Sequence, residues 1–170
     1  MATERASSPG GRRPGGSRQA EHDGVTRIVE VGAKPETERA ATAEAWLVTT
    51  PEAVARLVAG TAKGSPIESA KLAGVTGVKR TPDLLPHCHP IRVTGADVAI
   101  EPHEADGHLH VVATVRAIDR TGVEMEALTA ASVAALSLYD TVKAFDRAAR
   151  IEGVRLLAKS GGKSGDYRAD

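Results

Sequence analysis

Residues 121–147 read TGVEMEALTAASVAALSLYDTVKAFDR, and the rest of the chain is organised around this stretch. Apolar residues recur in it at steps of three and four, which at ~100° per residue places them on one stripe of a helix. The stripe consists of Leu128, Ala131, Ala135, Leu138, Val142 and Phe145. Acids stand near the start of the stretch and bases near its end, as the helix dipole favours. We therefore predict a helix over 121–147 with one face in the core.

The opposite face of this helix mixes charged and apolar residues. Asp140 and Lys143 are neighbours there at i,i+3 spacing, with Val133 and Leu136 beside them. Large apolar side chains beside solvated charges predict that another segment or another subunit covers this face. In a partly dry place an Asp/Lys pair can serve acid–base chemistry. An ordinary surface ion pair is the alternative.

Composition narrows the class of protein. A chain of 170 residues is long enough for one domain with a core, and we expect that domain to span 25–170. Residues 1–24 are rich in Gly, Ser, Arg and Pro, which predicts a disordered tail. Lys plus Arg and Asp plus Glu both total 22, so the charge favours neither nucleic acid nor a membrane as partner. The single cysteine, the lack of an apolar run of ~20 residues and the lack of an export signal predict a cytoplasmic protein.

The remaining periodic segments complete a fold class. Thr50 before Pro51 and Ser65 before Pro66 are helix N-cap signals. Predicted strands cover 44–48, 91–101, 108–118 and 153–157, and predicted helices cover 50–60 and 65–78, the latter followed by a turn at 79–82. Gly74 and Gly77 weaken the second of these helices unless they allow close packing. The order is that of a ferredoxin-like βαββαβ fold, an α+β architecture with an antiparallel sheet and helices on one face.

The segment His87-Cys88-His89 lies between two prolines. If it is extended, the two histidines point to one side and the cysteine to the other. A zinc hydrolase built on His87 and His89 is one interpretation, although a zinc site needs three or four ligands. The other candidates carry no recognisable ligand motif: His103, His108 and His110. Substrate recognition by a proline-stiffened loop is the interpretation that we favour.

Several cations are scattered along the chain. Gly162-Lys163-Ser164 resembles the end of a Walker A loop, but Leu157 stands where that motif needs Gly and no room remains for its helix. A Gly-rich turn with Lys159 and Lys163 can still hold phosphate oxygens. Lys63 and Lys79 add further cations. Together with the acids and the histidine loop, this inventory suits a polyanionic small molecule and an acid–base step.

Longer motifs point to a known family. They are Lys79-Arg80-Thr81, 85–90 (LPHCHP), 121–129 (TGVEMEALT), Tyr139-Asp140 with Lys143-Ala144, and 154–166 (VRLLAKSGGKSGD). In this order they closely resemble the MoaC family of cyclic pyranopterin monophosphate synthases, which act in molybdenum cofactor biosynthesis. The resemblance covers roughly 25–167.

The resemblance implies a reaction, an assembly and a set of residues. A 3′,8-cyclised dihydro-GTP is converted to cyclic pyranopterin monophosphate with release of pyrophosphate, a lyase reaction for which no cofactor and no metal-binding residue is implied. The assembly is a homohexamer, a trimer of dimers with active sites at the dimer interfaces. Asp140 is implied as the catalytic acid/base, assisted by Lys63 and Lys143. The implied substrate-binding residues are His87, Cys88, His89, Glu124, Met125 and Glu126, with Lys79 and Lys159 nearby.

The chain departs from the family pattern in two places. His87 stands where the family usually has Leu, and residues 28–31 read IVEV where it usually has Met-Val-Asp-Val. Both departures leave Asp140 and Lys143 in place, so activity is expected to survive. A ferredoxin-like module that binds a nucleotide without turning it over is the alternative from another class.

Overall fold

Strand β1 (Thr37–Val48) lies at the centre of the sheet in the computed structural model, which describes residues 26–170. Its side chains alternate between two faces, because successive residues of a strand point in opposite directions. The residues of one face are buried: Ala41, Ala43, Ala45 and Leu47. Thr42 and Trp46 lie on the other face and stay partly exposed. The predicted disordered tail at 1–24 falls outside the described residues.

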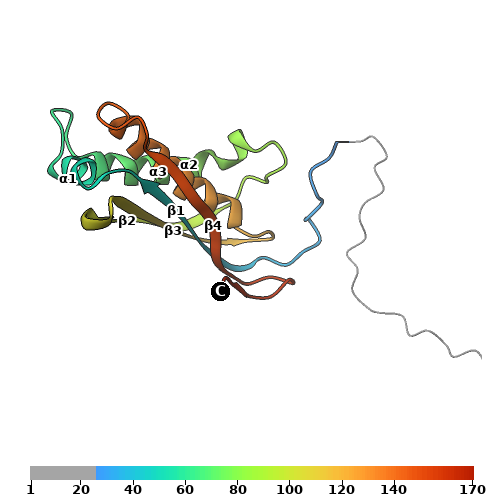
Figure 1. Ribbon diagram of the computed structural model, residues 1–170. Helices are drawn as coiled ribbons and strands as arrows, with labels where there is room; N and C mark the ends of the chain where they lie inside the picture. Colours follow the sequence, from blue (N-terminus) through green and yellow to red (C-terminus); the bar gives the residue numbers. More distant parts are fainter. Residues whose placement is uncertain (1–25) are drawn as a thin grey trace, which may run out of the picture.

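Five antiparallel strands form one sheet in the order β2-β3-β1-β4-β5 (Figure 1). The further strands are β2 (Val93–His103), β3 (His108–Asp119), β4 (Arg150–Ser160) and β5 (Tyr167–Arg168). The helices are α1 (Pro51–Ala59), α2 (Pro66–Leu84) and α3 (Glu124–Val142), and a 3-10 turn, η1 (Glu104–Asp106), joins β2 to β3. The predicted α+β class is therefore confirmed. The order of β1 to β4 is consistent with a ferredoxin-like fold, and β5 is an addition that we did not predict.

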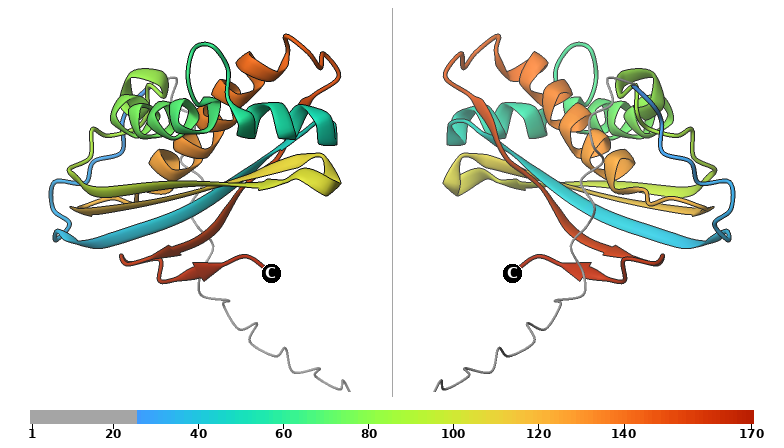
Figure 2. Two further views of the ribbon diagram at one scale, coloured as in Figure 1. Left: turned by 90° about the vertical axis from the view of Figure 1, so that its left-hand side faces the viewer. Right: turned by 90° about the vertical axis from the view of Figure 1, so that its right-hand side faces the viewer.

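The three helices cover one face of the sheet (Figure 2). Between the layers lies a core made mostly of Ala, Val and Leu. The predicted core stripe of α3 is largely confirmed: Ala131, Ala135, Leu138 and Val142 are buried. Leu128 and Phe145 are only partly buried at the edge of this core. No helix within residues 26–170 combines the length and apolar character needed to cross a membrane.

Local capping signals set the starts of α1 and α2 as predicted. The Thr50 hydroxyl accepts a hydrogen bond from the Ala53 N–H at 3.2 Å, and the Ser65 hydroxyl accepts one from the Glu68 N–H at 3.2 Å. These bonds satisfy amides that have no partner inside the helix. Each helix also carries proline in its first turn, where no N–H is needed.

The predicted turn at 79–82 is wrong, since α2 continues to Leu84 through Pro82. Proline lacks an N–H and usually ends a helix. Here it lies near the C-terminus and removes only one hydrogen bond. Thr81, which is fully buried, donates its hydroxyl to the Gly77 carbonyl at 3.0 Å. The Leu85 N–H closes the last turn on the Thr81 carbonyl at 3.0 Å.

Helix α3 is shorter than the predicted 121–147. It starts at Glu124 and ends at Val142, so Lys143 is its C-cap and Arg150 opens β4 instead of closing the helix. Beyond Val142 the chain forms a turn instead of further helix. The Val142 carbonyl accepts hydrogen bonds from the N–H groups of Phe145 and Asp146 at 2.9 and 2.8 Å. The chain must turn there because β4 runs back beside β1.

Helices α2 and α3 cross at the two glycines of α2. A Cβ atom at Gly74 would lie 3.0 Å from the Ala130 carbonyl oxygen, and one at Gly77 would lie 3.2 Å from the Val133 side chain. Both positions are tighter than ordinary van der Waals contact. The predicted close packing is confirmed, and it covers Val133 on the outer face of α3. Leu136 stays 57% exposed, so within this chain the predicted cover of that face is incomplete.

Candidate active site

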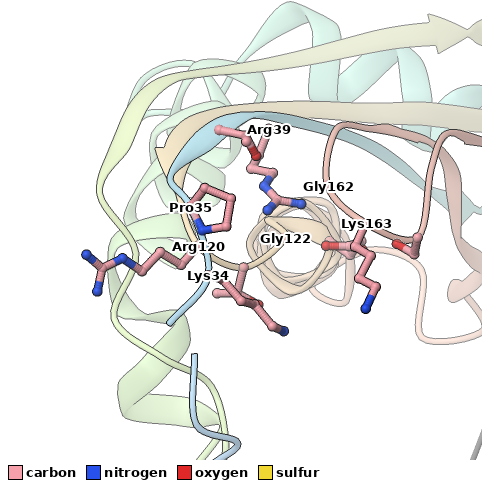
Figure 3. A pocket seen from close by; sticks show the side chains of 11 residues that line it. Lys34, Pro35, Arg39, Arg120, Gly122, Gly162 and Lys163 are labelled. Carbon is pink, nitrogen blue, oxygen red and sulfur yellow. The ribbon is translucent and has the colours of Figure 1, made fainter. Parts of the chain in front are cut away.

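A cationic cavity lies beside the N-terminal end of α3. It has a volume of about 790 Å³ and is lined from the segment before β1, from β1, from the β3–α3 loop and from the β4–β5 turn. Its cations are Lys34, Arg39, Arg120 and Lys163 (Figure 3). Arg120 lies at one side, with its guanidinium directed away from that of Arg39. The cavity is lined by these four cations and one acid, Glu124, so its charge suits a multiply charged anion.

Arg39 is held beside the Gly-rich β4–β5 turn. Its Nε donates to the Asp119 carbonyl at 3.4 Å, and its guanidinium lies next to Gly162 (Figure 3). Gly162 has φ +84°, and a Cβ atom there would collide with the guanidinium. The backbone conformation therefore favours glycine, and any larger residue would also displace the Arg39 guanidinium. The Gly-rich turn that we expected to hold phosphate oxygens thus borders a cationic cavity. The cations of this cavity include Arg39 of β1 in addition to Lys163 of the turn.

A second, smaller cavity of about 320 Å³ shares its wall with the first through Thr121, Gly122 and Glu124. Its other lining residues include the predicted substrate group His87, Cys88, His89, Met125 and Glu126. The predicted alternation of the histidine loop is wrong. A turn bonds the Cys88 N–H to the Leu85 carbonyl at 2.9 Å, so all three residues of the loop line the same cavity.

Glu126 is the unusual group of this cavity. Its side chain is only 2% exposed, and neither carboxylate oxygen has a hydrogen-bond partner among the described residues. Burial, with smaller contributions from the charges of Glu124 and Asp119, raises its pKa to about 7. Burial and the nearby Glu126 also raise the pKa of the Cys88 thiol. At neutral pH this end of α3 therefore holds a carboxyl group that can carry a proton.

Glu124 stands between the two cavities. Its carboxylate pairs with the Lys159 ammonium at 3.0 Å, and Lys159 also donates to the Ser164 hydroxyl at 2.9 Å. This pair ties β4 and the β4–β5 turn to the start of α3. Lys159, which the resemblance places near the substrate, is thus next to both cavities.

The predicted catalytic group assembles at the opposite end of α3. The Lys143 ammonium lies 2.7 Å from the Asp140 carboxylate. Lys143, with a smaller contribution from Lys63 on the α1–α2 loop, lowers the pKa of Asp140, and Asp140 raises that of Lys143. Asp140 is 75% exposed and Lys143 56% exposed, so the expected dry environment is absent within this chain. Asp140 is a stable carboxylate at neutral pH and fits the role of a base.

The structure brings the predicted residues together as two groups instead of one. Glu126 and Asp140 are 14 positions apart on a straight helix, which at 1.5 Å per residue separates them by ~21 Å. One group contains the histidine loop and the acids at the start of α3. The other contains Lys63, Asp140 and Lys143. That separation exceeds the combined reach of the two side chains, so the two carboxyl groups cannot meet at one reacting atom within one chain.

Sequence reasoning missed three cations of the large cavity. Lys34 and Arg39 precede Arg120 by about 80 positions, and no local motif contains them. The signal that brings them together is strand pairing, in which Thr37 lies opposite Asp119. Only Lys163 was identified, because the Gly-rich turn around it is a local pattern.

Comparisons with known proteins agree with the motif resemblance. The profile of the MoaC family matches residues 28–162. A protein of Deinococcus radiodurans named cyclic pyranopterin monophosphate synthase is 53% identical over 147 residues, which cover 86% of each chain. Proteins of the same name from Streptomyces griseus subsp. griseus and Brucella ovis are each 51% identical over 85% of this chain, and cover 81% and 88% of their own lengths.

Proposed function

The chain belongs to the MoaC family, and we propose that it is a cyclic pyranopterin monophosphate synthase of molybdenum cofactor biosynthesis. The observation that carries this proposal is the 51–53% identity to relatives of that name over 85–86% of the chain. The reaction converts 3′,8-cyclised dihydro-GTP to cyclic pyranopterin monophosphate and pyrophosphate, and is of the phosphorus–oxygen lyase type. One domain over 25–170 and a cytoplasmic location are part of the same proposal.

The triphosphate binds in the cationic cavity. Arg39 and Lys163 reach the cavity from two directions, and Lys34 adds a third charge. Such cations neutralise the substrate and also the pyrophosphate that forms when the bond between the α- and β-phosphates breaks. The base-derived ring occupies the adjoining cavity, where His87, Cys88 and His89 surround it.

Proton transfer is divided between two carboxyl groups with opposite pKa shifts. Asp140, kept ionised by Lys143 and Lys63, accepts the proton of the oxygen nucleophile that attacks the α-phosphorus. Glu126, whose pKa is about 7, gives or holds a proton at the ring. Acid–base catalysis at neutral pH needs one group that is protonated and one that is ionised. Two carboxyl groups can fill these roles when their environments shift their pKa values in opposite directions.

Two subunits complete each site. The ~21 Å between Glu126 and Asp140 on α3 keeps the two carboxyl groups of one chain from acting on the same reacting centre. The Asp140 group of one subunit therefore faces the cavities of another. Exposed apolar residues support an interface on the helical layer, with Leu72 69% and Leu136 57% exposed. A homohexamer, a trimer of dimers with sites at the dimer interfaces, is the assembly that we propose.

A turnover assay tests the function. Purified full-length chain is incubated with the cyclised dihydro-GTP, and the cyclic monophosphate product and pyrophosphate are quantified in equal amounts. GTP serves as the control substrate and is expected to give no product. Tight binding of the cyclised compound without product after prolonged incubation would identify a ligand-binding module instead.

A further inference from the structure

The hairpin turn between β2 and β3 gathers three side chains with metal-binding chemistry, far along the sheet from the cationic cavity. His103 ends β2, Asp106 lies in η1 and His108 begins β3. Each offers a ligand atom, and these three atoms lie within 4.8 Å of one another. The turn is found at the left end of the sheet in Figure 1, below α1. Neither the family resemblance nor the proposed reaction uses this turn.

Strand pairing and one glycine create this arrangement. His103 and His108 are the last register pair of the hairpin, and their ring centroids are 4.7 Å apart. Gly107 between Asp106 and His108 adopts φ +70°, which reverses the chain within four residues. Its carbonyl accepts from the Thr49 N–H at 2.8 Å, so the turn is fixed to the end of β1. Strand pairing therefore holds the two histidines, and the fixed turn places Asp106 between them.

The histidines are packed but incompletely bonded. Trp46 contacts both rings, with centroid distances of 6.0 Å to His103 and 5.1 Å to His108. The Nε2 atom of His103 is buried and has no hydrogen-bond partner among the described residues. A buried polar atom without a partner lowers stability. A ligand that accepts the lone pair of a neutral imidazole removes this cost.

His110, which lies two residues after His108 on β3, already has a stacking partner and a hydrogen-bond partner. Its ring stacks on Trp46 at 3.8 Å, and its Nε2 lies 2.6 Å from the Glu44 carboxylate. Glu44 also accepts from Arg155 at 2.6 Å. These bonds leave His110 outside the set of ligands and help to hold Trp46 against the other two histidines.

We infer that His103, Asp106 and His108 form a binding site for a divalent transition metal, with Zn²⁺ as the ion that fits best. Two imidazoles and one carboxylate are a known ligand set for zinc, whereas Mg²⁺ prefers oxygen ligands alone. Zn–N and Zn–O bonds of about 2.0–2.2 Å require the three atoms to close by small side-chain rotations. Three protein ligands leave the fourth position of a tetrahedral site to water or to another donor. The metal clamps the hairpin turn.

Trp46 makes the site directly observable, because it is the single tryptophan of the chain. Full-length protein stripped with a chelator is titrated with Co²⁺, which has accessible d–d absorption and quenches indole fluorescence. We expect saturable quenching and a tetrahedral Co²⁺ absorption band at one equivalent per chain. Zn²⁺ should then displace Co²⁺ and reverse both signals.

Variants identify the ligands. Asp106 is exposed, so Asp106→Asn should fold normally and weaken Co²⁺ binding at least about tenfold, since one of three ligands loses its charge. His108→Ala should abolish binding. The matched control is Asp97→Asn, an exposed aspartate of β2 paired with Arg116 outside the turn, which should bind as the parent does. His87→Ala tests the histidine loop and should also bind normally.

Three results would overturn the site. They are the absence of saturable Co²⁺ binding to the folded chain, unchanged binding in both Asp106→Asn and His108→Ala, and loss of binding in His87→Ala. Loss of binding in His87→Ala would indicate that the metal binds at the histidine loop instead. Product formation is not a readout here, so failure of this site leaves the proposed function untouched.

Discussion

The two ends of α3 present carboxyl groups in opposite environments. Glu126 at the start is 2% exposed and has a pKa raised to about 7 by burial. Asp140 at the end is 75% exposed and has a pKa lowered by the Lys143 ammonium. Desolvation is the main cause of the pKa shift of Glu126, and pairing with the Lys143 ammonium is the main cause of the pKa shift of Asp140. Within this chain one end of α3 is therefore enclosed, whereas the other is an open surface.

Asp140→Asn should have the largest effect on activity. It removes the proton acceptor, and kcat is expected to fall by about 10²–10⁴-fold, as is typical for loss of a general base. Because the side chain is exposed, thermal unfolding should stay unchanged. The measurement is steady-state turnover of the cyclised dihydro-GTP together with a melting curve.

Asp83→Asn is the matched control for that variant. Asp83 also forms an exposed i,i+3 ion pair on a helix, with Arg80 at 3.1 Å. It should retain parental activity. Equal losses in the two variants would show that any exposed helical ion pair is sensitive, and full activity of Asp140→Asn would remove Asp140 from the mechanism.

Glu126→Gln should change the free energy of unfolding in a way that depends on pH, because the carboxyl group that it removes is buried. Below pH 4.5 the carboxyl is protonated in both states, so it does not change the free energy of unfolding. Between its ordinary pKa of 4.5 and its folded value of about 7, only the unfolded chain ionises, which favours unfolding as pH rises. Above pH 7 the cost reaches roughly 3 kcal/mol. The substitution should therefore raise the unfolding free energy at pH 8 more than at pH 5.

Urea titrations at pH 8 and pH 5 measure this effect. Glu68→Gln is the control, since Glu68 is 65% exposed and forms a surface pair with Lys71. Its effect should not differ between the two pH values. A Glu126→Gln effect that is likewise independent of pH would contradict the raised pKa.

Arg39→Ala should affect binding rather than chemistry. Loss of a charge-assisted hydrogen bond to phosphate, worth about 1.5–3 kcal/mol, predicts a KM increase of about 10–100-fold with kcat little changed. Arg150→Ala is the control, because Arg150 is exposed and pairs with Glu152 at 2.8 Å outside the cavity. A fall in kcat at unchanged KM would place Arg39 in the transition state instead.

Local signals predicted the parts of the fold that depend on neighbours in sequence. The Thr50 and Ser65 side chains cap amides three residues away, so the starts of α1 and α2 could be predicted from the sequence. The lengths of the strands could not be predicted in this way. β1 starts at Thr37, whereas its alanine-rich first half has little strand propensity and was predicted as no strand. Its pairing with β3 and β4 imposes the extended form.

The site was predictable only where a motif is continuous. Residues 87–89 and 124–126 are each local runs, and the structure brings both to one cavity. The cations Arg39 and Arg120 meet only through strand pairing across about 80 residues, which no single motif records. The zinc interpretation of His87 and His89 was likewise built on a local run. Within residues 26–170 the group of three possible ligand atoms that lie close together is instead in the β2–β3 turn.

In the proposed assembly, each active site combines the start of α3 from one chain with the end of α3 from another. Co-expression of Asp140→Asn and Glu126→Gln chains with different tags isolates mixed oligomers. Each parent lacks one of the two proposed proton-transfer groups and should have low activity. If subunits share sites, random mixing restores both carboxyl groups in about a quarter of the sites, and turnover should rise toward that fraction of the unsubstituted activity. Mixed oligomers that are no more active than either parent would contradict the claim.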